Sequence, residues 1–103
     1  MSYKIKISNS AFDDLAFIKN FIALDNEHKA NEYIKKLFEK IDCLQDFPFL
    51  GKKGDENKIC ARDIYFLPCL NHIIIYKVEK QNELIRLVRV VSHYQNWTNI
   101  LEK

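Results

Sequence analysis

The sequence contains little that would interrupt a compact fold. Its 103 residues include only two glycines and two prolines, which argues against a long low-complexity linker. No run of 18 apolar residues occurs, so no membrane-spanning helix is predicted. The opening segment, M-S-Y-K-I-K-I, also lacks the apolar run of a signal peptide. We therefore expect one cytoplasmic domain over residues 1–103, without a membrane partner.

Cysteine is scarce as well, and its spacing is unsuited to a metal site. Cys43, Cys60 and Cys69 form no C-x-x-C pair, and their number is odd. We expect three reduced thiols that pack as small hydrophobic side chains. Neither a metal nor a cofactor is predicted.

Net charge is small, but it is divided unevenly along the chain. Seven Lys and eight acids give −1 over residues 1–47, whereas nine Lys plus Arg and six acids give +3 over residues 48–103. All three arginines, Arg62, Arg86 and Arg89, belong to the second part. This bias permits an anionic partner, and a solvated surface of mixed charge is the alternative.

A short strand and a helix are predicted at the start of the chain. Apolar and polar side chains alternate over residues 3–8, which is typical of a strand with one buried face. Ser8 or Ser10 can then cap a helix. Asp13, Asp14 and Lys19 are expected to point away from its buried side. The apolar stripe of this helix consists of Ala11, Leu15, Ile18 and Ile22, broadened by Phe12 and Phe21.

A second helix is predicted after a short break at residues 24–26. Its apolar positions recur in steps of three and four, at Ala30, Tyr33, Ile34, Leu37, Ile41 and Leu44. The helix should end near Phe47, because Pro48 disfavours helical geometry in the residue before it. Two helices joined by a short link are expected to pack as an antiparallel hairpin.

Three β-rich runs follow a predicted exposed loop at residues 49–57. They span residues 58–67, 69–78 and 83–92, and the connections at Leu67-Pro68 and residues 79–82 suit antiparallel hairpins. Trp97, Ile100 and Leu101 predict a last short helix on the sheet. The predicted fold class is α+β in the order β-α-α-β-β-β-α, a helical hairpin packed on a small, mainly antiparallel sheet.

The arginines are candidate anion ligands. Each lies in a β-rich run among apolar neighbours, so two guanidinium groups on one sheet face would form a cationic spot that can hold a phosphate bidentately. Parity along residues 83–92 places Arg86 and Arg89 on opposite faces, without showing which one faces outward. The alternative is that each arginine pairs with an acid such as Asp63, Glu79 or Glu83.

The end of the last strand supplies candidate acid-base chemistry. His93 can act as a general acid or base, and Tyr94 can stack on a base or orient a phosphate. With Arg62, Arg89 and the loop pair Lys52 and Lys53, these side chain types suit RNA cleavage. The alternative is an ordinary strand end. His72 is interpreted as structural.

Several segments together resemble the RelE/ParE family of bacterial toxins. The first is Y-K-I-K-I-S-x-x-A-x-x-D-L-x-x-I, which ends at Ile18, and F-P-F-L-G follows the second helix. Arg62 then stands fourteen residues before Tyr76 in I-I-I-Y-K-V, and R-V-V-S-x-x-x-N-W begins at Arg89. After Ser92 the chain departs from the family pattern, because His93 and Tyr94 stand where many relatives have arginines.

The resemblance implies a toxin of a type II toxin-antitoxin pair, bound by a cognate antitoxin at its sheet or helical hairpin. RelE-like members cut mRNA on the ribosome without a metal, whereas ParE-like members poison DNA gyrase. We favour ribosome-dependent mRNA cleavage, with a gyrase inhibitor or an inactive binding module as alternatives.

In the cleavage hypothesis, Arg62 and Arg89 bind the scissile phosphate, His93 is the acid or base, and Tyr94 orients a base. Lys52, Lys53 and Arg86 would contact the RNA backbone.

Overall fold

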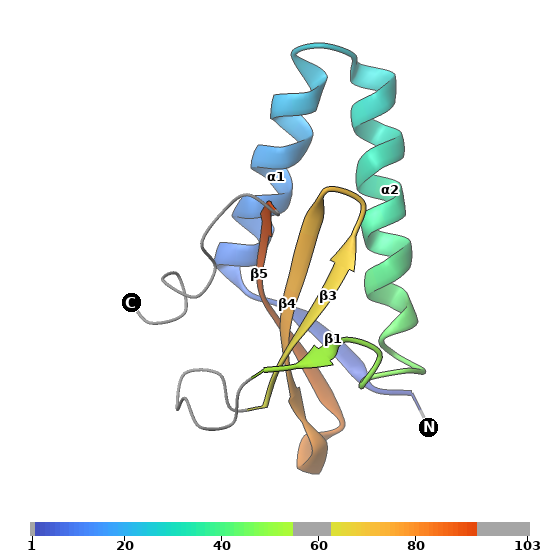
Figure 1. The fold of residues 1–103 in the computed structure, drawn as a ribbon, viewed down its shortest axis with the longest axis vertical. Helices are drawn as coiled ribbons and strands as arrows, with labels where there is room; N and C mark the ends of the chain where they lie inside the picture. Colours follow the sequence, from blue (N-terminus) through green and yellow to red (C-terminus); the bar gives the residue numbers. More distant parts are fainter. Residues whose placement is uncertain (1, 55–62, 93–103) are drawn as a thin grey trace.

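A computed structural model describes residues 2–54 and 63–92 of the chain (Figure 1). Its elements are β1 (Lys4–Ile7), α1 (Asn9–Ala23), α2 (Glu27–Cys43), β2 (Lys52–Lys53), β3 (Ile64–Cys69), β4 (His72–Glu79), the 3₁₀ turn η2 (Lys80–Asn82) and β5 (Leu84–Ser92). The predicted α+β class is confirmed. The predicted last helix at Trp97 to Leu101 lies outside the described residues, and so does Cys60.

Side chain caps start both helices, and the cap of α1 at Ser8 is one of the two that the sequence predicts. Ser8 is the N-cap of α1, and its Oγ accepts a hydrogen bond of 3.0 Å from the Ala11 amide. Asn26 caps α2 in the same way through the Lys29 amide, at 3.0 Å. The helix α2 ends at Cys43 with Leu44 as its C-cap, and turn residues continue to Asp46. The helix is therefore shorter than predicted, because its expected end was near Phe47.

The five strands form one sheet in the order β1-β5-β4-β3-β2. β1 runs parallel to β5, and the other neighbours are antiparallel. The helices α1 and α2 run side by side and pack on one face of this sheet (Figure 1). The main core lies between the two layers and includes Leu15, Leu37, Ile74, Tyr76, Ile85 and Leu87. The opposite sheet face, called the open face here, carries a smaller cluster around Ile75 and Val91.

A β-bulge in β5 breaks the simple parity predicted for that strand. Leu87 pairs with Tyr76 and Arg89 pairs with Ile75, so Val88 is an extra residue without a partner in β4. Before the bulge, Ile85 and Leu87 face the helices. Beyond it, Val90 joins the main core and Val91 faces the other way. The parity of a regular strand would put Ile85, Leu87 and Val91 on one face, so the expectation of simple parity along β5 is wrong.

The strand around Pro68 also differs from the prediction. The predicted connection at Leu67-Pro68 is wrong, because β3 continues through Pro68 to Cys69 and the tight turn comes at Leu70, whose φ is 57°. Proline is tolerated there because β2 pairs only with Tyr65 and Phe66, which leaves β3 an edge strand at Pro68. The predicted loop also contains β2, which pairs antiparallel with β3.

Three residues of α1 also depart from the expected pattern. Phe12 and Phe21 do not broaden the buried stripe, because 63% and 65% of their surfaces are exposed. Asp14 does not point away from the core side but binds β5. Among the helices that the structure describes, none is long and apolar enough to cross a membrane.

The core assignment predicts unequal effects of the same substitution at two leucines. Leu37 is fully buried in α2, whereas Leu24 at the end of α1 is 87% exposed. Leu37→Ala should lower the free energy of unfolding by about 2–5 kcal/mol, because it leaves a cavity in the main core. Leu24→Ala, the matched control, should change it by less than about 0.5 kcal/mol. Urea denaturation followed by circular dichroism measures both, and equal effects would contradict this core.

Candidate functional site

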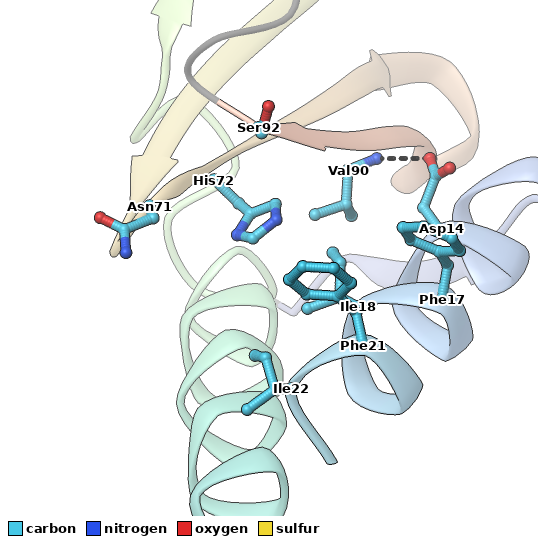
Figure 2. Close-up of a pocket in the computed structure, with 9 residues that line it drawn as sticks. All are labelled: Asp14, Phe17, Ile18, Phe21, Ile22, Asn71, His72, Val90 and Ser92. Atoms are coloured by element: carbon cyan, nitrogen blue, oxygen red, sulfur yellow. Dashed lines mark hydrogen bonds between the residues drawn. The ribbon is translucent and has the colours of Figure 1, made fainter. Parts of the chain in front are cut away.

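The side chain of Arg89 is held by Asp14 of α1. Arg89 Nε donates to Asp14 Oδ2 at 2.7 Å, and Nη2 donates to Oδ1 at 3.0 Å. The Val90 amide also donates to Oδ2, at 3.0 Å (Figure 2). These hydrogen bonds to Asp14 raise the pKa of the Arg89 guanidinium, which stays charged. We call this group of three residues the Asp14 clasp.

The Asp14 clasp occupies the guanidinium face that would hold a phosphate. A bidentate carboxylate uses the same paired N–H donors as a bidentate phosphate. Arg89 therefore has to leave Asp14 before it can bind a phosphate in that way. The sequence analysis gave pairing of each arginine with an acid as the alternative to phosphate binding. Arg89 does pair with an acid, but Asp14 was not among the acids named there.

Arg86 lies on the open face and pairs with Glu79. The Arg86 Nε donates to Glu79 Oε2, and this hydrogen bond is the main reason why the pKa of Glu79 is lowered. Nearly half of the Arg86 side chain, 48%, remains exposed. Pairing of Arg86 with a neighbouring acid is thus confirmed, and its contact with RNA stays a prediction.

The remaining predicted site residues are not gathered around Arg89 in the part of the chain that the structure describes. Lys52 and Lys53 form β2, which β3 and β4 separate from β5. With about 4.8 Å between neighbouring strands, β2 and β5 are about 14 Å apart. Arg62, His93 and Tyr94 lie outside the described residues, so their roles stay predictions.

A groove of 410 Å³ lies between α1 and the ends of β4 and β5. Its wall is mostly apolar, with Phe17, Phe21 and Ile22 from α1 facing His72, Val90 and Ser92 of the sheet (Figure 2). Asp14 lies at one end, where its carboxylate is already bonded within the Asp14 clasp. The groove therefore suits an apolar group better than an anion.

An exposed apolar stripe on α1 borders this groove. Phe17, Phe21 and Leu24 recur at helical spacing and are 70%, 65% and 87% exposed. The rings of Phe17 and Phe21 stack with their centroids 6.3 Å apart. We call these three residues the α1 stripe. The α1 stripe was not predicted from the sequence, although apolar residues on more than one face of a helix can indicate an exposed apolar surface.

Tyr33 of α2 fixes the far end of the groove. Its hydroxyl accepts a hydrogen bond of 3.1 Å from the Asn71 amide and is 2.5 Å from His72 Nδ1. Burial raises the pKa of Tyr33, so the neutral hydroxyl can donate to Nδ1 while it accepts from Asn71. These bonds tie the β3–β4 turn to α2, in agreement with the structural role predicted for His72.

A metal centre is not evident in the described ranges. Within residues 2–54 and 63–92, no three His, Cys, Asp or Glu side chains are placed to hold a metal ion together. Cys43 and Cys69 are free thiols, and burial raises the pKa of the Cys69 thiol. The candidate binding groups in these ranges are therefore cationic side chains and apolar surface.

The sequence matches a family described as ParE toxin of type II toxin-antitoxin system, parDE, over residues 5–97. No curated protein matches it. Three solved structures share the fold. The RelBE2 toxin-antitoxin complex from Mycobacterium tuberculosis contains a chain 15% identical at a TM-score of 0.62, with 90% of this chain and 100% of that chain covered.

The other two structures are slightly more similar in shape. The chromosomal ParDE system from P. aeruginosa is 17% identical at a TM-score of 0.69, with 88% of this chain and 96% of that chain covered. A mutant of E. coli toxin RelE in the free state is 11% identical at a TM-score of 0.69, with 97% and 93% covered. At such identities the likeness establishes the fold alone.

The Asp14 clasp makes a prediction about stability. Asp14→Ala removes the acceptor of Arg89 and of the Val90 amide, so the free energy of unfolding should fall by about 1.5–3 kcal/mol, the range for hydrogen bonds to charged groups. Asp13→Ala, at the exposed neighbouring position, is the control because it makes the same change in helix propensity. Thermal and urea unfolding measure both variants. If they unfold alike, the clasp does not stabilise the contact between α1 and β5.

Proposed function

Because the match covers most of its length, the chain belongs to the ParE toxin family of type II toxin-antitoxin systems, and we propose that it stops growth by binding a protein target. DNA gyrase is the target that the family resemblance implies. Binding to such a protein target requires a contact surface and does not require nuclease chemistry. The observation that carries the proposal is the α1 stripe beside its groove.

The α1 stripe has the properties of a protein contact surface. Large aromatic side chains that stand exposed beside an apolar groove are typical anchors of protein interfaces. Phe17 and Phe21 are both more than 60% exposed, and each also lines the groove. A partner that covered them would bury apolar surface, and Asp14, the acid that lines the groove, is already bonded to Arg89.

Cleavage of mRNA, which the sequence analysis favoured, is the second candidate. Arg86 stays half exposed on the open face, and this favours an anionic partner. In this mechanism Arg62 and Arg89 hold the scissile phosphate, His93 transfers the proton and Tyr94 orients a base. Lys52, Lys53 and Arg86 contact the RNA backbone. The Asp14 clasp argues against it, because the carboxylate already takes the Nε and Nη2 donors of Arg89 that a phosphate would use.

A cognate antitoxin is the expected partner in the uninduced cell. Two of the similar structures are toxin-antitoxin systems, RelBE2 and ParDE, which supports an antitoxin for this chain. The helical hairpin and the sheet are the surfaces on which the family resemblance places it. Binding of an antitoxin over the α1 stripe would block the target at the same time.

Brief induction without the antitoxin separates the two activities. For a gyrase inhibitor we expect cleaved gyrase-DNA complexes and a DNA damage response, with messages intact in primer extension. Discrete new 5′ ends within codons, abolished by Arg62→Ala or His93→Ala, would instead establish mRNA cleavage. A chain that leaves growth unchanged would be the inactive binding module.

A matched pair of phenylalanine substitutions tests the α1 stripe. Phe17 and Phe12 are 70% and 63% exposed on the same helix, but Phe12 lies about 140° around it from Phe17. Phe17→Ser should weaken binding to purified gyrase by about tenfold or more, as loss of an interface anchor does. Phe12→Ser should leave binding within about twofold. Equal affinities in surface plasmon resonance would overturn the proposed contact.

A further inference from the structure

The open face of the sheet carries a row of cations across three strands. Lys6 of β1 pairs in register with Arg86 of β5, and Arg86 pairs with Lys77 of β4. Their neighbours Ile5, Ile85 and Val78 point into the main core. Because side chains alternate along a strand, the three cations point to the side away from the helices. We call Lys6, Arg86 and Lys77 the cationic row.

The cationic row is compact and accessible. Neighbouring strands are about 4.8 Å apart, so the three charges lie within about 10 Å across the sheet. All three residues are exposed. Lys4 stands two residues before Lys6 on the same face and extends the positive surface along β1.

The charge of this surface exceeds that of the whole protein. Four cations, Lys4, Lys6, Lys77 and Arg86, and one carboxylate, Glu79, give a local charge of +3. The whole chain carries +2, so the remainder is net negative. Glu79 is the only acidic residue in the described strands. Both Arg86 and Lys77 lower its pKa, which agrees with their position around it.

The geometry points to the phosphate backbone of a nucleic acid as the ligand of this face, and we propose that the cationic row binds it. Arginine holds two phosphate oxygens through its fork, and lysines on either side add point charges. This function goes beyond binding of the protein target and does not depend on it, whereas it extends the RNA contact of Arg86 in the second candidate function to Lys6 and Lys77. Arg86 need not leave Glu79 entirely, since its other nitrogens remain available.

A nucleic acid fits this face better than an acidic protein segment does. Protein interfaces rely on large apolar anchors, and all the strongly exposed ones that the structure describes lie on helices, loops or turns. Examples are Phe17, Phe49 and Leu70, none of which belongs to β1, β4 or β5. Phosphate contacts give affinity without such anchors, through release of counterions.

Binding of the purified full chain to labelled 20-mers tests the proposal, with single-stranded RNA and double-stranded DNA as separate arms. Fluorescence anisotropy at several salt concentrations gives the slope of log affinity against log salt. Loss of three phosphate contacts in Lys6→Gln/Arg86→Gln/Lys77→Gln should reduce this slope by about 2.7 on DNA or about 2 on RNA. The control Lys29→Gln/Lys35→Gln/Lys36→Gln removes the same charge from exposed positions of α2 and should leave the slope nearly unchanged.

Glu79→Gln provides a gain of function that a folding defect cannot imitate. Removal of Glu79, the one acid in the described strands, should raise the affinity by roughly two- to fivefold, the range set by one exposed ion pair. A lower affinity of the row variant for either nucleic acid supports the proposal. Whether RNA or DNA binding is lowered shows which nucleic acid is the ligand. Equal losses in the row and control variants would overturn it. The proposal would also be overturned if the cationic row bound poly-glutamate but bound neither RNA nor DNA.

Discussion

The carboxylate of Asp14 joins α1 to β5 at the point where β5 is irregular. Two of its hydrogen bonds hold the Arg89 side chain, and a third holds the Val90 amide just beyond the bulge at Val88. A bulge leaves a strand locally without its ladder partners, and a polar side chain that supplies an acceptor offsets this loss. This carboxylate therefore sets the direction of the Arg89 side chain, satisfies the Val90 amide beyond the bulge and forms one end of the groove.

This arrangement divides the protein into two chemically different sides. On the helix side, Asp14 balances the charge of Arg89, and a mostly apolar groove lies beside the α1 stripe. On the open face, the strands carry cations, and Glu79 is the one acid among the strand residues that the structure describes. Because the sheet lies between them, the two surfaces can take different partners at the same time.

The sequence was sufficient for the elements whose signal is local. The cap at Ser8 and the period of α2 depend on neighbours in the chain, and these predictions are confirmed. The parity of β5 was not predictable, because a bulge is set by packing on both faces. Asp14 shows a different limit: its spacing from Ala11 and Ile18 places it on the buried stripe, but its charge argued for solvent. Asp14 can face the core side because it pairs with Arg89, which is 75 residues away in sequence.

The parallel pairing of β1 with β5 has a consequence for how the protein is made. Lys4 lies beside Leu84, and the Ser8 hydroxyl donates to the Val88 carbonyl at 2.9 Å, so the first strand rests on the last one described. During synthesis the amino-terminal strand and α1 emerge long before β5, and neither can reach its final place until β5 leaves the ribosome. A toxin built in this way completes its sheet only after β5 has been translated, so the two surfaces described above form late in synthesis.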